Sequence, residues 1–141
     1  MEGFFKTKGT PSTEKRVYWI YAFRKKGRYP RSTARSGKWL IFVYKKNVDV
    51  VWEKIRRATE EGNLGNRAKV ATSKPNPHRK RGLRVICVYT HDWKDVADVK
   101  RMRAELRKLG IIQPIPYKAD QDSLHDKYSG EGRKRISKYY E

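Results

Sequence analysis

Two amphipathic segments, residues 47–61 and 95–109, constrain the fold of this 141-residue chain more than any other feature. In each segment apolar residues recur at intervals of three and four positions, the spacing of one face of an α-helix. The first stripe is Val48, Val51, Trp52, Ile55 and Ala58, and the second is Val99, Met102, Leu106 and Leu109. Because a helix with one apolar stripe buries one side only, both helices must pack against another layer.

The ends of both predicted helices carry recognisable signals. Asn47 or Asp49 can cap the first helix, and Asp95 can cap the second, since these short polar side chains accept hydrogen bonds from free helix amides. Gly62 and Gly110 follow the two stripes, as glycine commonly does at the C-terminus of a helix.

Short runs of β-branched and aromatic residues predict the strands: 17–23, 38–44, 67–72 and 83–90. We expect 38–44 to be covered on both faces and 83–90 to be a central strand. Residues 115–118 should form a last edge strand, because Pro116 cannot donate to a ladder. The order β-β-α-β-β-α-β predicts an α+β fold, with a mostly antiparallel sheet backed on one face by two helices.

This element order predicts a single domain over residues 17–120. Residues 1–16 indicate a basic N-terminal arm, and residues 121–141 a polar and basic C-terminal tail. Inside the domain, residues 24–37 and 73–82 are basic loops rich in glycine, proline and serine.

The single cysteine, Cys87, excludes an internal disulfide and a cysteine metal cluster. It fits a reducing, cytoplasmic location, and we find neither a signal peptide nor a run long enough to cross a membrane. The three histidines show no metal-ligand spacing, so we expect no metal and no cofactor.

Charge is the strongest functional signal, because 35 basic residues against 15 acids give a net charge of +20. Most of this excess lies in residues 1–36 and 74–84, and the second segment holds no acid, which predicts a basic patch built from loops. A domain so basic repels itself unless a polyanion neutralises it. Nucleic acid is the commonest such partner when aromatic residues are interleaved with the cations.

We therefore expect a non-catalytic RNA-binding protein that contacts structured RNA, ribosomal or transfer RNA, in association with translation, the ribosome and its proteins. Guanidinium groups bind phosphate bidentately, and aromatic rings stack on bases. The predicted RNA-contacting residues are Lys15, Arg16, Arg24, Lys25, Lys26, Arg28, Arg31, Arg35, Lys74, Arg79, Lys80, Arg81 and Arg84, with Trp19 and Tyr29 as the aromatic candidates.

Two other functions stay open. In an enzyme acting on RNA or a nucleotide phosphate, His91 and Lys118 would be the acid and base, provided that they converge in one pocket. Capping of the following helix by Asp92 or Asp95 is a competing, purely structural explanation of this region. A module binding an acidic protein partner is the third hypothesis.

Several stretches, in order, carry a family resemblance: Gly-Lys-Trp-Leu-Ile-Phe-Val at 37–43, Val-Trp-Glu-Lys-Ile at 51–55, Gly-Asn-Leu-Gly at 62–65, Val-Ile-Cys-Val-Tyr-Thr at 85–90 and Pro-Tyr-Lys-Ala-Asp at 116–120. Over residues 17–120 the chain resembles the basophilic-leukaemia-expressed protein family. The resemblance implies a fold similar to the eukaryotic cap-binding translation initiation factor, a curved antiparallel sheet with helices on its convex side.

Cap binders of that fold hold a guanine between two tryptophans. Of the four tryptophans here, Trp39 and Trp52 are expected in the core, which leaves Trp19 and Trp93 as candidates. Their spacing does not reproduce such a sandwich, so cap binding is not inferred from the resemblance.

Overall fold

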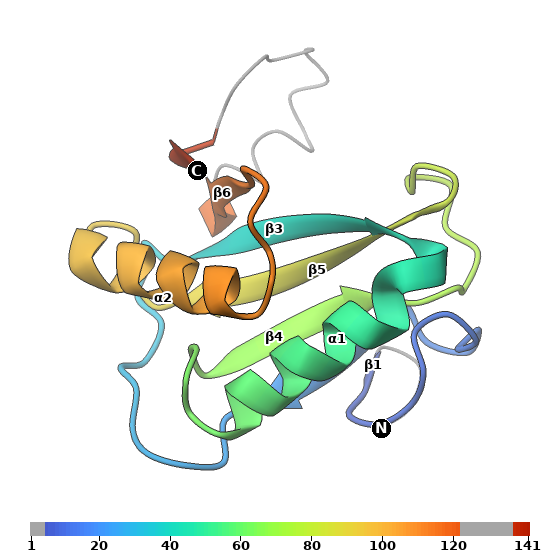
Figure 1. The fold of residues 1–141 in the computed structure, drawn as a ribbon, viewed down its shortest axis with the longest axis horizontal. Helices are drawn as coiled ribbons and strands as arrows, with labels where there is room; N and C mark the ends of the chain where they lie inside the picture. The colour runs from blue at the N-terminus through green and yellow to red at the C-terminus, as the bar shows by residue number, and fades with distance from the viewer. Residues whose placement is uncertain (1–4, 122–136) are drawn as a thin grey trace.

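Both helices lie on one face of a seven-stranded sheet (Figure 1). The computed structural model describes residues 5–121 and 137–141. The strand order is β1-β2-β4-β5-β3-β6-β7, antiparallel except for the parallel pair β1 and β2. The predicted α+β fold is confirmed. The elements are β1 (Phe5–Lys6), β2 (Trp19–Phe23), β3 (Gly37–Tyr44), α1 (Lys45–Glu60), β4 (Arg67–Ala71), β5 (Leu83–Thr90), α2 (Val96–Lys108), β6 (Pro116–Ala119) and β7 (Tyr139–Tyr140).

Helix α1 begins two residues earlier than predicted. Tyr44 is its N-cap residue and makes no side-chain capping bond, so the prediction that Asn47 or Asp49 caps this helix is wrong. The Asp49 carboxylate instead accepts hydrogen bonds from the backbone N–H and the hydroxyl of Ser12. The Asp49 carboxylate, which local sequence predicted as a helix cap, thus binds Ser12 of the N-terminal segment.

The other helix signals are confirmed. Asp95 caps α2 by accepting a hydrogen bond from the backbone N–H of Asp98. Gly62 and Gly110 follow α1 and α2 with φ angles of 87° and 98°, in the left-handed region that favours glycine. No helix in the described part of the chain is both long and apolar enough to cross a membrane.

The strand predictions hold with two corrections. β5 is central as expected, but β3 is covered on both faces only over its first half, since Phe42 is 51% and Tyr44 63% exposed. The last strand is not an edge strand, because β6 pairs with both β3 and β7. A two-residue strand such as β7 is too short to leave a pattern in the sequence.

One hydrophobic core joins the helices to the sheet. Its largest fully buried side chains include Trp39, Tyr117, Ile41, Ile86 and Met102. The indole N–H of Trp39 donates to the Val99 carbonyl at 3.2 Å, which satisfies its one polar atom. Trp52 is 2% exposed, so the placement of both tryptophans in the core is confirmed.

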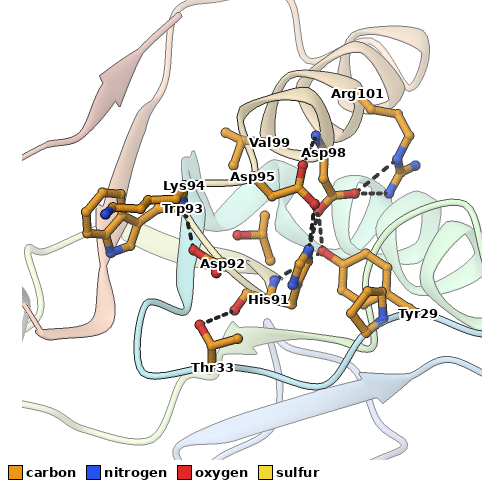
Figure 2. Close-up of polar contacts among 12 residues, drawn as sticks. Tyr29, Thr33, His91, Asp92, Trp93, Lys94, Asp95, Asp98, Val99 and Arg101 are labelled. Atoms are coloured by element: carbon orange, nitrogen blue, oxygen red, sulfur yellow. Dashed lines mark hydrogen bonds and ion pairs between the residues drawn. The ribbon is translucent and has the colours of Figure 1, made fainter.

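Residues 24–36, between β2 and β3, are fastened to the start of α2 by a polar cluster (Figure 2). The Tyr29 hydroxyl donates to Asp98 at 2.5 Å and accepts from the His91 backbone N–H at 3.1 Å. His91 Nε2 lies 2.9 Å from Asp95 Oδ2. Burial, together with the hydrogen bond to Asp98, raises the pKa of Tyr29.

A second fastening joins the end of the same loop to the residues after β5. The Arg35 guanidinium donates to both carboxylate oxygens of Asp92, with N–O distances of 2.6 and 2.9 Å. These hydrogen bonds lower the pKa of Asp92 to about 2. The ion pair is therefore complete at neutral pH and lost only in strong acid.

Replacing Trp39 with alanine should destabilise the fold by about 3–5 kcal/mol, because it empties a fully buried site. Phe42→Ala, on the open side of the same strand, is the matched control and should cost about 1 kcal/mol or less, since its ring is half exposed. Chemical denaturation followed by circular dichroism measures both. Equal losses would contradict the assignment of the core to the helix side.

Arg35→Met should flatten the acid dependence of stability. Because the pKa of Asp92 is lowered in the folded state, its carboxylate stabilises the protein above its unfolded pKa of about 3.9, and this stabilisation disappears as pH falls toward 2. Melting temperatures measured from pH 5 to pH 2 should fall more steeply for the wild type than for the variant. Parallel curves would show that the pair does not couple to folding.

Candidate nucleic-acid interface

Strand alternation places a second set of side chains on the sheet face opposite the helices. Wherever one residue of a strand enters the core, its neighbours point to the other side. No helix of the described residues covers that side, which we call the open face (Figure 1). It carries Trp19, Tyr21 and Phe23 from β2, Lys38, Leu40 and Phe42 from β3, Arg67 and Lys69 from β4, and Val85, Cys87 and Tyr89 from β5.

Lys69 occupies the middle of the open face and is surrounded by aromatic rings. Its ammonium lies 3.8 Å from the ring centroid of Trp19 and 5.9 Å from those of Tyr21 and Tyr89. Burial lowers its pKa, and the nearby Lys38 and Arg67 act in the same direction. Within the described residues no carboxylate forms an ion pair with Lys69, so cation–π interactions with the surrounding rings stabilise its charge.

The same arrangement continues on both sides of Lys69. The Arg67 guanidinium lies 4.2 Å from the Tyr89 ring centroid, and its Nε is buried without a hydrogen-bond partner. Lys38 binds Asp120 at 2.7 Å and lies 5.8 Å from the Tyr89 ring. Cations and aromatic rings therefore alternate across the open face from β2 to β3.

A cavity of about 270 Å³, which we call the loop-73 cavity, opens where β2, β4 and β5 meet the loop of residues 73–82. Its apolar wall includes Tyr18, Trp19, Phe42, Leu83 and Val85. Its polar rim consists of Lys74, Asn76, His78, Arg79 and Lys80. An aromatic wall beside a cationic rim can take a ligand with a flat apolar ring and an anionic group.

The N-terminal segment and the 73–82 loop are joined at this end of the sheet. Ser73 donates from its backbone N–H to Glu14 O and from its hydroxyl to Ser12 O, while Lys74 Nζ donates to Arg16 O at 3.2 Å. Six predicted residues belong to these two joined segments, which we call the loop-73 end: Lys15, Arg16, Lys74, Arg79, Lys80 and Arg81.

These cations differ in availability. Arg79 donates to the carbonyls of Thr72 and Lys74 and so shapes the loop. Arg84 is buried, and this burial lowers its pKa. It donates hydrogen bonds to Ser73 Oγ and Leu83 O at the two ends of the loop and so helps to hold the loop in place. Among the described residues, Lys15, Lys80 and Arg81 are exposed and form no ion pair.

The other predicted basic loop, residues 24–37, lies at the opposite end of the sheet. The reason is strand direction: β2 and β4 are antiparallel neighbours, so the chain leaves them at opposite ends. Several of its cations are used internally, since Arg24 donates to Leu64 O, Lys25 pairs with Glu60, and Arg35 pairs with Asp92. Lys26, Arg28 and Arg31 are exposed.

A second cavity, of about 260 Å³, lies at this opposite end of the open face. Phe23, Arg31, Asn66, Arg67 and Tyr89 line it, together with the ring of Tyr29. Arg31 and Tyr29 were predicted from the sequence as RNA-contacting residues. Arg67, Lys69, Phe23 and Phe42 were not, although their alternation with buried residues along β2, β3 and β4 was a usable signal.

The proposed catalytic pair is not brought together. His91 contacts Asp95 and Asp98 at the start of α2, on the helix side. Lys118 stands opposite Lys38 in the ladder, on the open face, because the residues flanking it, Tyr117 and Ala119, enter the core. The two side chains lie on different sides of the sheet.

The tryptophans do not form a two-ring clamp. Trp39 and Trp52 are in the core. Trp19 lies in the wall of the loop-73 cavity, whereas Trp93 follows the far end of β5, where it packs against the core and under the ammonium of Lys138.

Solved structures with a similar fold include translation initiation factors. Ascaris suum eIF4E-3 with m2,2,7G cap gives a TM-score of 0.60 at 18% identity, covering 92% of this chain and 73% of that one. Schistosome eIF4E complexed with m7GpppA and 4E-BP gives 0.57 at 15%, covering 76% and 59%. C. elegans eIF4E-3 with the 4E-binding protein Mextli gives 0.50 at 20%, covering 63% and 55%.

The chain thus spans less than two thirds of the last two neighbours, and identities this low establish a shared fold, which confirms the expected initiation-factor-like sheet. The sequence itself carries the more specific match. Residues 30–123 match the sequence model of basophilic leukemia-expressed protein Bles03. That match covers well over half of the chain, which therefore belongs to the Bles03 family.

Proposed function

We propose that this protein is a non-catalytic RNA-binding protein that grips RNA phosphates with the loop-73 end. The observation that carries the proposal is the set of exposed, unpaired cations Lys15, Lys80 and Arg81 beside an aromatic-walled cavity. Exposed cations that form no ion pair can neutralise phosphates and release their counterions. A total charge of +20 favours association with RNA over any partner of mixed charge.

The loop-73 cavity adds a place for a base to stack, which phosphate contacts alone do not provide. A base inserted against Trp19 and Phe42 would gain stacking energy, on the order of 1–3 kcal/mol, while its phosphate meets Lys74 or Lys80 at the rim. With a volume of about 270 Å³, the cavity lies just below the size range of pockets for drug-sized ligands, which suits a single base.

The proposed target is structured RNA such as ribosomal or transfer RNA, and the proposed setting is translation. The neighbours of this fold described with bound caps are translation factors, which supports an RNA-related role for this fold. Structured RNAs also offer unpaired loops whose bases can enter a cavity. An acidic protein partner could also meet these cations, and the nuclease test below separates it from RNA.

Charge reversal at the loop-73 end tests the proposal. The triple variant Lys15→Glu, Lys80→Glu, Arg81→Glu should weaken RNA binding about tenfold or more and lower the slope of log K against log salt by about two to three. The control, Lys54→Glu, Arg57→Glu, Lys108→Glu, changes net charge equally on the exposed sides of the helices. Because Arg57 and Lys108 pair with Glu53 and Glu105, thermal melting must show that this control remains folded. Equal losses in both triples would show that binding follows total charge and would overturn the assigned surface.

Salt dependence tests for phosphate contacts, and nuclease treatment separates RNA binding from the acidic-partner alternative. Wild-type affinity for transfer RNA should fall steeply with salt, with on the order of five or more counterions released. Fluorescence anisotropy at increasing potassium chloride measures the slope. A slope near zero, or co-purifying material that survives nuclease treatment, would contradict the proposal.

A further inference from the structure

Four exposed aromatic residues lie on the open face: Phe5 is 43%, Phe23 41%, Phe42 51% and Tyr44 63% exposed. Two more lie outside this row, since Tyr18 lines the cavity beside Trp19 and Tyr140 belongs to β7. On the helix side, the large exposed hydrophobics among the described residues are the aliphatic Val50, Val96 and Ile112. A set of rings exposed on one sheet face marks an interaction surface.

The rings of β2 line a path between the two cavities. Trp19 borders the loop-73 cavity, and Phe23, at the other end of the strand, borders the second cavity. The strand between them is about 13 Å long at about 3.3 Å per residue. Tyr21 lies in between, with its ring stacked on Phe23 at a centroid distance of 5.6 Å and an interplanar angle of 5°.

Cationic side chains lie near both ends of this path. Lys69 lies over Trp19 near one end, and Arg67 lies over Tyr89 near the other. Arg31 contributes to the second cavity. Within the described part of the open face the nearby carboxylate is Asp120, which Lys38 already binds.

We infer that the open face binds a single-stranded stretch of RNA that runs along β2 from the loop-73 cavity to the second cavity. This inference rests on the proposed function and names its substrate class. Bases stack on Trp19, Phe42 and Phe23, and phosphates pass over Lys69 and Arg67. A duplex cannot use this surface, because its base faces are stacked inside the helix.

The proposed path also explains why the two basic loops can lie at opposite ends of the sheet and still contact one RNA strand. Strand direction sends them to opposite ends of the sheet, and a strand of RNA lying along β2 meets both.

Two ring deletions test the inference. Phe42→Ala and Phe23→Ala should each weaken binding of a fluorescein-labelled oligouridylate of about 12 nucleotides by at least about fivefold. Phe42→Tyr and Phe23→Tyr should retain binding, since tyrosine keeps the ring. Binding of a fully paired RNA duplex of the same length should be unchanged in all four variants. Val50→Ala and Ile112→Ala, which are exposed on the helix side, are the controls and should have no effect.

The outcomes distinguish the inference from the function on which it rests. If the ring deletions leave oligouridylate binding intact while the loop-73 charge reversal weakens it, the inference is overturned and the proposed function stands. If the wild type binds neither oligouridylate nor transfer RNA, both fail. Thermal melting of every variant guards against unfolding, and the tyrosine variants keep the test valid should an alanine variant unfold.

Discussion

Side-chain alternation along the strands is the constraint on which the rest of the structure depends. Because α1 and α2 both pack on one face, alternate strand residues such as Trp39 and Ile41 must enter the core from that side. The residues between these core residues therefore point to the open face, which no described helix covers. The row of rings and cations from Trp19 to Lys38 follows from the way the core is packed.

Electrostatics divides the cations of this chain into two groups. Arg35, Arg24 and Arg84 donate hydrogen bonds to carboxylate, carbonyl or hydroxyl oxygens of the protein itself and hold loops in place. Lys15, Lys80 and Arg81, and at the other end Arg28 and Arg31, remain exposed. Sequence composition alone counts both groups equally, whereas only the second group can add phosphate contacts without breaking a structural one.

Much of the fold was predictable from local sequence, and the exceptions have physical causes. The helical stripes, the Asp95 cap and the glycine stops depend on residues within a few positions of each other, and these predictions hold. The start of α1, the strands β1 and β7 and the separation of the basic loops involve partners far along the chain, such as Gly82, whose carbonyl accepts from the Lys45 N–H. For the candidate site, composition pointed to the loop-73 cations and Trp19, but Lys69 and Arg67 looked like ordinary strand residues until the pairing of β4 was known.

Ultraviolet crosslinking of the full chain to bound RNA, followed by mass spectrometry of the crosslinked peptides, tests most directly whether RNA binds the open face and the loop-73 end. If bases stack on the rings of this surface, we expect crosslinks in residues 17–23, 38–44 and 73–82. Crosslinks concentrated in α1 and α2 would contradict this expectation, because they would place the RNA on the helix side of the sheet.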